Sequence, residues 1–390
     1  MTSIPADAGG ASPAEPTVRW KDSKRYLWLL GLAVPMLPAA AYAWSRNTGW
    51  PVFFWLGPLW VFVLIPIADT VFGTDTSNPP DWAVPQLERD RYYRWCTYLY
   101  FPLQYASLVL AAWVVTTHDL SWVDSLGLAL TVGVVGGVGI ANAHELGHKT
   151  DKLERRLSKL VLAQTAYTHF FVEHNRGHHV RVATPEDPAS ARLGESFWAF
   201  LPRTVVGSMQ SAWRLETARL RAQHKRVWSL ENDLLTGWGL TIALFGGLTV
   251  GFGPRIVPFL VLQAVVGFCL LEVVNYVEHY GLLRPRRADG SYERCQPSHS
   301  WNSNHVGSNV FLYHLERHSD HHAFPTRRYQ ALRHFDESPQ LPTGYAGMIL
   351  LAMVPPLWRR VMDHRVVEHY GGHIELANVQ PSKRTRIVAG

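Results

Sequence analysis

The chain has 390 residues, 47% of them hydrophobic, and a formal net charge of +6 at pH 7. The basic residues lie beside apolar stretches and no RNA- or DNA-binding motif accompanies them, which argues against nucleic acid as a partner. Three scattered cysteines without a CxxC pair indicate neither a disulfide framework nor a cysteine-bound metal centre.

In chain order, residues 1–20 are rich in Ala, Pro, Gly and Ser and predict a disordered tail. Six apolar stretches follow, each close to the ~20 residues that cross a bilayer as a helix. They cover residues 26–44, 51–67, about 96–115, 122–143, 234–250 and 256–274. The end of the first stretch resembles a signal-peptide cleavage site, but its length and the second stretch close behind favour an uncleaved span. The sequence therefore predicts an all-α, polytopic integral membrane protein with six transmembrane helices.

Lysine and arginine are distributed unevenly over the connections between these stretches. Arg46 stands alone between the first two, and none lies between the third and fourth. Residues 21–25 and 149–159 are rich in both, and residues 89–94 contain three arginines. The positive-inside rule then places both termini and the large polar segments in the cytoplasm. The expected organisation is a tail (1–20), four spans (21–143), a cytoplasmic insert (144–233), two spans (234–277) and a cytoplasmic C-terminal region (278–390). Within the last, residues 344–357 are apolar but short, which predicts a helix on the membrane or packed on the core.

Histidines are clustered in the polar segments at helical spacing. Box one is HELGHK, box two EHNRGHH and box three LERHSDHHA, and one further histidine stands in NYVEHYG. On a helix, residues three or four apart share a face, and imidazole is a common ligand of transition metals. Nine donors suit two metals rather than one, and they are His144, His148, His174, His178, His179, His279, His318, His321 and His322.

The map of the spans places all of these boxes on one side of the membrane, in a helical cap near its surface. An uncharged imidazole set around two metals, beside an apolar interior, suits oxygen activation. Carboxylates next to the boxes are expected to accept the second ring N–H of the ligands, in preference to binding the metal directly or facing solvent. These are Glu145, Glu173, Glu278 and Asp320, and His314 is a further candidate for such a supporting role or for a tenth ligand.

Two other interpretations compete with this one, and one further pair of histidines needs a separate explanation. HELGH alone matches the HExxH pattern of zinc proteases, but a protease would leave boxes two and three without a purpose. His369 and His373 echo the NYVEHYG element without following a span, and we interpret them as unrelated to the metal site. A metal transporter would line its spans with ionisable groups, whereas here only Asp69 and Glu272, near span ends, stand out.

With these residues laid out, the sequence resembles the bacterial membrane-bound alkane 1-monooxygenases, within the integral-membrane desaturase and hydroxylase superfamily. The resemblance runs from about Lys24 to Gly372 and rests on the four histidine elements. It also includes DPAS after box two, HSWNSNH before box three and PTRRYQALR after it. The superfamily shares the three boxes, whereas the element NYxEHYG marks the alkane group.

The resemblance implies that the nine histidines hold two non-haem iron ions that hydroxylate the terminal methyl of an n-alkane with O2. It implies electrons from a rubredoxin, supplied by a separate reductase and NAD(P)H, and a multi-pass location in the bacterial inner membrane. No CxxC pair is present, so the rubredoxin is not fused to this chain. Box three commonly reads LQRHSDHH in this family. Here Glu316 replaces the glutamine and is expected to add negative charge near the partner surface or the site.

Selectivity for a terminal carbon requires a narrow channel. Trp55, Trp60 and Val61 in the second span and Leu315 beside box three are candidates for its wall, although each could equally be an ordinary packing or lipid-facing residue. A membrane acyl-chain desaturase of the same superfamily remains the rival enzyme, because it would share the metals and differ in needing room for an acyl head group.

Overall fold

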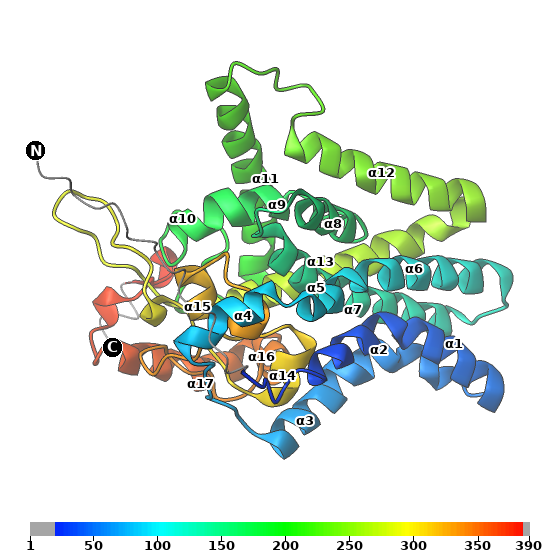
Figure 1. The fold of residues 1–390 in the computed structure, drawn as a ribbon, viewed down its shortest axis with the longest axis horizontal. Helices are drawn as coiled ribbons and strands as arrows, with labels where there is room; N and C mark the ends of the chain where they lie inside the picture. The colour runs from blue at the N-terminus through cyan, green and yellow to red at the C-terminus, as the bar shows by residue number, and fades with distance from the viewer. Residues whose placement is uncertain (1–19, 385–390) are drawn as a thin grey trace, which may run out of the picture.

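The computed structural model describes residues 20–384, so the tail predicted over residues 1–20 lies almost wholly outside the described residues. Within that range the regular elements are helices, and β-pairing is limited to isolated bridges such as Thr74 with His305. The all-α prediction is therefore confirmed for the described chain. Figure 1 shows long helices lying side by side and a cap of shorter helices at one end of them.

Among the described residues, six helical segments are long and apolar enough to cross a membrane, one for each predicted stretch. Their bounds are Leu27–Thr48, Pro51–Phe72, Arg91–Thr117, Trp122–Gly147, Asp233–Phe252 and Pro254–His279. The fourth and sixth continue past their apolar stretches, to Gly147 and His279, as helices α7 (Trp122–Gly147) and α13 (Val257–His279). The first histidine of box one and His279 therefore stand on the last turns of helices that cross the membrane.

The other spans are built from several pieces. The first comprises a 3-10 segment, Leu27–Met36, and α1 (Leu37–Thr48), and the third comprises α5 (Arg91–Tyr98) and α6 (Tyr100–Thr117). The second contains a 3-10 segment (Pro51–Trp55), α2 (Leu56–Leu59), a π segment (Trp60–Leu64) and α3 (Ile65–Phe72). The fifth is α12 (Asp233–Phe252).

Helix α7 is the centre of the bundle. Of its most apolar window, 83% is buried inside the protein, against 17% for α12, which Figure 1 places at the outer edge. Glycines bring α7 and α13 close together, since a Cβ on Gly133 would lie 2.6 Å from the Val266 side chain. The central helix is thereby held rigidly in protein, while α12 exposes Ile242 and Val250 where lipid would lie.

The cap contains the polar segments between and after the spans. Its helices are α4 (Val84–Arg89), α8 (Lys152–Ala163), α9 (Phe170–Glu173), α10 (His179–Arg181), α11 (Phe197–Ala222), α14 (Val306–Phe311), α15 (His318–Ala323), α16 (Tyr345–Ala352) and α17 (Pro355–His369). The apolar segment 344–357 forms α16, which buries Tyr345, Met348 and Ile349 in a core cluster shared with α13. Of the two predicted positions, on the membrane or on the core, the structure shows the helix packed on the core. The next helix, α17, begins at Pro355.

Candidate metal centre

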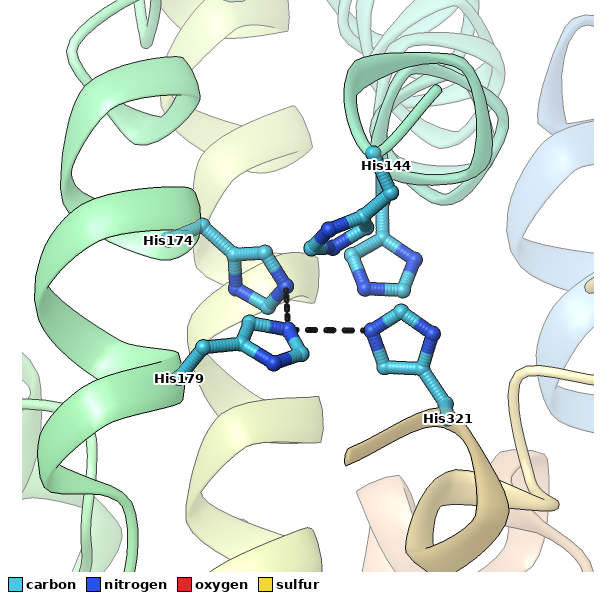
Figure 2. Close-up of side chains that lie close together, drawn as sticks. His144, His174, His179 and His321 are labelled. Carbon is cyan, nitrogen blue, oxygen red and sulfur yellow. Dashed lines mark hydrogen bonds between the residues drawn. The ribbon is translucent and has the colours of Figure 1, made fainter. Parts of the chain in front are cut away.

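The nine histidines singled out in the sequence converge in the structure. They form two groups, in each of which one ring nitrogen per residue lies within 4.8 Å of all the others. One group has five members, His144, His148, His174, His179 and His321, and the other has four, His178, His279, His318 and His322. Figure 2 shows rings of the first group meeting from three different segments of the chain. Residues up to 178 positions apart thus share one site.

The ends of the central helices supply two of the anchors. His144 lies in the last turn of α7, and His279 is the last residue of α13. Box three forms the six-residue helix α15, so that His318 and His322, four residues apart, meet at 2.9 Å between their Nε2 atoms. The predicted shared helical face of box three is therefore present.

Box two departs from the α-helix that its spacing suggested. Residues His174–His178 form a π turn between α9 and α10. A π turn carries i→i+5 hydrogen bonds and brings residues five apart into register. His179 and His174 meet at 3.1 Å between their Nε2 atoms, whereas His178 belongs to the other group. One widened turn of helix therefore serves both groups at once.

Burial favours the uncharged form of six of these rings. Burial, and after it the neighbouring histidines, lowers the pKa of His148, His174 and His179 well below the usual range. The same causes, burial first, lower the pKa of His318, His321 and His322. A neutral imidazole offers a lone pair, which is the form that binds metal.

The donor atoms fit a pair of metal ions. The Nε2 atoms of His144, His148 and His178 are buried and have no hydrogen-bond partner among the described residues. Other rings face one another nitrogen to nitrogen, as His321 and His179 do at 3.1 Å. Buried polar atoms are normally satisfied, and convergent neutral nitrogens would be satisfied by a shared cation.

Two carboxylates contact rings of the four-histidine group. Asp187 Oδ2 lies 2.9 Å from Nδ1 of His178 and accepts a second hydrogen bond from Ser190. Burial opposes its ionisation, but His178 and these hydrogen bonds lower the pKa of Asp187 to about 2. A carboxylate on Nδ1 fixes the tautomer that leaves Nε2 free for a metal. Asp187 is the first residue of the DPAS element, to which the sequence analysis gave no role.

Glu278 is the second of these carboxylates. Its Oε2 lies 3.2 Å from Nε2 of His318, on the side where the nitrogens of the group converge. It is 1% exposed. This carboxylate therefore lies on the Nε2 side of the His318 ring, rather than behind the ring on its Nδ1 side as the sequence predicts.

The other three predicted carboxylates are paired with cations. Glu145 lies 3.0 Å from Nζ of Lys149, and Glu173 accepts from Arg181 at 2.7 Å. Asp320 accepts two hydrogen bonds from Arg327. Glu145 and Asp320 also accept from the backbone N–H groups of Tyr329 and Arg333, and the three carboxylates thus hold the cap together around the histidines.

His314 lies outside both groups. Its Nδ1 donates to the Tyr329 carbonyl at 2.9 Å, and its ring packs edge-on against Trp28 at 4.6 Å. Glu316, expected near the partner surface or the site, is fully buried and accepts from the Tyr345 backbone N–H and from Asn309. A surface role for Glu316 is thereby excluded.

An apolar cavity of about 50 Å³ lies among α3, α7, α13, α14 and α16. Ala141 and Leu315 in its wall stand three residues before His144 and His318, which puts the cavity about one helical turn from the metal ligands. Of the predicted channel residues, Val61 and Leu315 line it. Trp55 instead packs on Gly127, and the Trp60 ring packs edge-on against Phe311.

Comparison with known proteins agrees with this site. The family model of fatty acid desaturases matches residues 120–352. The chain is 48% identical to the alkane 1-monooxygenase of Acinetobacter baylyi, over 96% of this chain and 92% of that protein. It is 46% identical to the alkane 1-monooxygenase of Ectopseudomonas oleovorans, over 93% and 90%. A xylene/toluene monooxygenase hydroxylase component of Pseudomonas putida is 26% identical over 78% and 82%. The chain therefore belongs to the fatty acid desaturase family and, within it, to the alkane 1-monooxygenases.

Proposed function

We propose that this protein hydroxylates the terminal methyl group of medium- or long-chain n-alkanes with O2, at a pair of non-haem iron ions held by the nine histidines. The reaction is R–CH3 + O2 + two electrons + two protons giving R–CH2OH + H2O. The observation that carries the proposal is the meeting of two neutral imidazole groups with an apolar cavity one helical turn away. The irons, when bound, supply the activation of dioxygen.

The protein's own residues prepare the reaction. Asp187 orients the ring of His178, and Glu278 is placed to act as a fifth donor of the four-histidine group. Val61, Ala141 and Leu315 line the narrow cavity that would receive the end of the chain. A narrow apolar pocket admits one methyl end at a time and excludes water, which favours reaction at the terminal carbon.

The electrons must come from outside, because the described residues contain no cysteine pair for a redox centre. We assign this role to a separate rubredoxin, reduced through its reductase by NAD(P)H. The cap, the metal site and both termini lie in the cytoplasm and the spans in the inner membrane, which the uneven distribution of Lys and Arg supports. The division into tail, spans 1–4, insert, spans 5–6 and C-terminal region also belongs to this proposal.

The test is turnover of octane and hexadecane by membranes that contain the protein, with rubredoxin, reductase and NADH. A primary alcohol carrying one atom of ¹⁸O from ¹⁸O2, together with two iron ions per purified chain, is the expected result. An alkene product would identify a desaturase instead. One zinc ion per chain and no oxidation would contradict the proposal altogether.

A further inference from the structure

Glu272 is a buried carboxyl group inside the sixth span that none of the chemistry above uses. It is 1% exposed and lies about two helical turns before His279 on α13. Its oxygens accept from the Tyr167 hydroxyl at 2.7 Å and the Thr204 hydroxyl at 2.8 Å. An ionisable group inside a membrane span is costly and usually serves a function.

Glu272 has no cationic partner among the ion pairs of the described chain, in contrast to Glu173 with Arg181. A buried carboxyl group without a cation is more stable as the neutral acid, and it then carries a transferable proton. The hydroxyls of Tyr167 and Thr204 can each donate or accept a hydrogen bond. The surroundings of Glu272 can therefore adapt to both of its protonation states.

A small cavity of about 10 Å³, whose wall includes several polar residues, adjoins Glu272. Its wall also contains Tyr167, His169, His174 and His178. About 10–15 Å³ of such volume is what a single water molecule needs. The cavity thus connects the carboxyl group of Glu272 with one ligand from each histidine group.

Several buried polar atoms around this cavity lack hydrogen-bond partners that a water molecule could provide. His169 is 1% exposed, and neither of its ring nitrogens has a hydrogen-bond partner in the described part of the chain. Oε1 of Glu173 accepts a hydrogen bond from Arg181, whereas its Oε2 is buried and has no hydrogen-bond partner in the described residues. A buried water typically makes two to four hydrogen bonds to groups of this kind.

A purely structural role is the alternative, and Asp69 shows what such a role looks like. Asp69 is also buried at the end of a span, and it accepts from the backbone N–H and the hydroxyl of Ser308 at 2.7 and 2.6 Å. Those bonds tie α3 to α14, and the cavity that Ser308 lines is apolar. Glu272 differs because it faces a cavity whose wall includes His174 and His178, one candidate metal ligand from each histidine group.

We propose that Glu272, through a water molecule in this cavity, supplies protons to the reduction of O2; the inference rests on the proposed function. The reaction takes up two protons for the two electrons from the carrier protein. In the step, the O–H bond of Glu272 breaks as its proton passes to the water, which releases one of its own protons toward the site. The carboxylate then regains a proton from solvent on the side of Arg181, whose side chain is 28% exposed. The titratable groups that face Glu272 or its cavity are Tyr167, His169, Glu173, His174 and His178.

The test compares Glu272→Gln with wild type in the full-length protein, supplied with the electron carrier. We expect unchanged metal content and thermal stability, a fall in alcohol formation of about 10- to 100-fold, and a larger solvent deuterium isotope effect. Glu272→Asp, which keeps the acid, should restore part of the rate. Glu195→Gln removes another buried carboxyl, which pairs with Arg203 away from the cavity, and should leave the rate and isotope effect unchanged.

Three results would overturn the inference. They are unchanged turnover and isotope effect in Glu272→Gln, loss of metal or stability in that variant, and equal losses in Glu272→Gln and Glu272→Asp. Infrared spectra of the metal-free protein provide a separate readout. A carbonyl band of a protonated carboxyl group should be present in wild type and missing in Glu272→Gln. Failure of wild type to form alcohol would refute the proposed function, whereas absence of this band would refute the inference alone.

Discussion

Both groups of the candidate metal centre consist of histidines, but they differ in whether carboxylates contact their rings. In the four-histidine group, Asp187 contacts His178, and Glu278 contacts His318. Near the five-histidine group, Glu145 and Glu173 are paired with Lys149 and Arg181. The four-histidine group therefore has negative charge on its ligands, and the five-histidine group has one more imidazole.

This difference teaches that ligand count alone does not describe a dimetal site. With Glu278 as a donor, each group would offer five donor atoms, but only one set would carry a negative charge. A carboxylate stabilises a divalent cation more than a neutral imidazole does in a buried site. We therefore expect the four-histidine group to hold its metal more firmly.

The largest effect should come from deleting one ligand in either group. His321→Ala removes a ring from the five-histidine group, and His322→Ala removes one from the other. Both variants should lose alcohol formation. The loss should exceed the roughly 100-fold decrease that removal of a ligand's hydrogen-bonding partner can cause. His321→Ala should retain about one metal ion per chain, measured by elemental analysis, and His322→Ala should retain less. Equal metal loss in the two variants would remove the asymmetry, and full activity in either would refute its role as a ligand.

Asp187→Asn should weaken metal binding in the four-histidine group by roughly 10- to 100-fold, because the amide no longer supplies charge behind His178. Titration of the metal-free protein with Fe²⁺ measures this affinity. Glu145→Gln is the matched control, since Glu145 pairs with Lys149 rather than with a ligand ring. A larger loss of affinity in Glu145→Gln than in Asp187→Asn would reverse the comparison.

Acid should destabilise the metal-free protein. Burial lowers the pKa of six of the histidine rings outside the spans, which are His148, His174, His179, His318, His321 and His322. Below about pH 6.5 the unfolded chain therefore binds more protons than the folded one. Stability then falls as pH falls, by about 1.4 kcal/mol per pH unit for each such ring. The thermal midpoint measured between pH 7.5 and 5.5 checks this slope.

Single-ring variants locate that slope. His321→Ala and His322→Ala should each reduce the dependence of stability on pH by about the contribution of one ring. Because four of the six rings belong to the five-histidine group, most of the slope should arise there. A thermal midpoint that does not change with pH would mean that the buried rings are protonated as easily in the folded protein as in the unfolded chain.

The smallest effect on activity should come from Glu316→Gln. Burial, and then the charge of Asp69, raises the pKa of Glu316 to about 8, so the folded protein keeps this acid neutral at pH 7 while the unfolded chain ionises it. Stability is lost as pH rises from about 4.5 to 8, and glutamine would avoid that loss. We expect a gain of about 1–3 kcal/mol at pH 7 in denaturation experiments, with unchanged metal content. Loss of metal would show that any nearby carboxyl group supports the four-histidine group.

Much of this architecture follows from local patterns in the sequence. The six spans are visible because the bilayer imposes one length and one polarity on each helix. The nine donors are visible because boxes such as His318 to His322 repeat a helical spacing. The central position of α7 is also indicated in the sequence, because small residues around Gly133 permit close packing with α13.

The rest depends on contacts between distant segments. The spacing of box two suggests an α-helix, and the π turn that sends His178 and His179 to different groups depends on the bundle around it. Nothing local distinguishes Asp187, which contacts a ligand, from Asp320, which pairs with Arg327. The burial of Glu316 likewise results from its contact with Tyr345, 29 residues away.

Helix α7 runs without a break from Trp122, at the far end of the bundle, to Gly147, three residues past His144. A helix that is too long or too short for the surrounding lipid adjusts by tilting. Any tilt of this rod would displace an imidazole at its tip. Because protein surrounds most of α7, a change in bilayer thickness should instead tilt outer helices such as α12 and leave that imidazole in place.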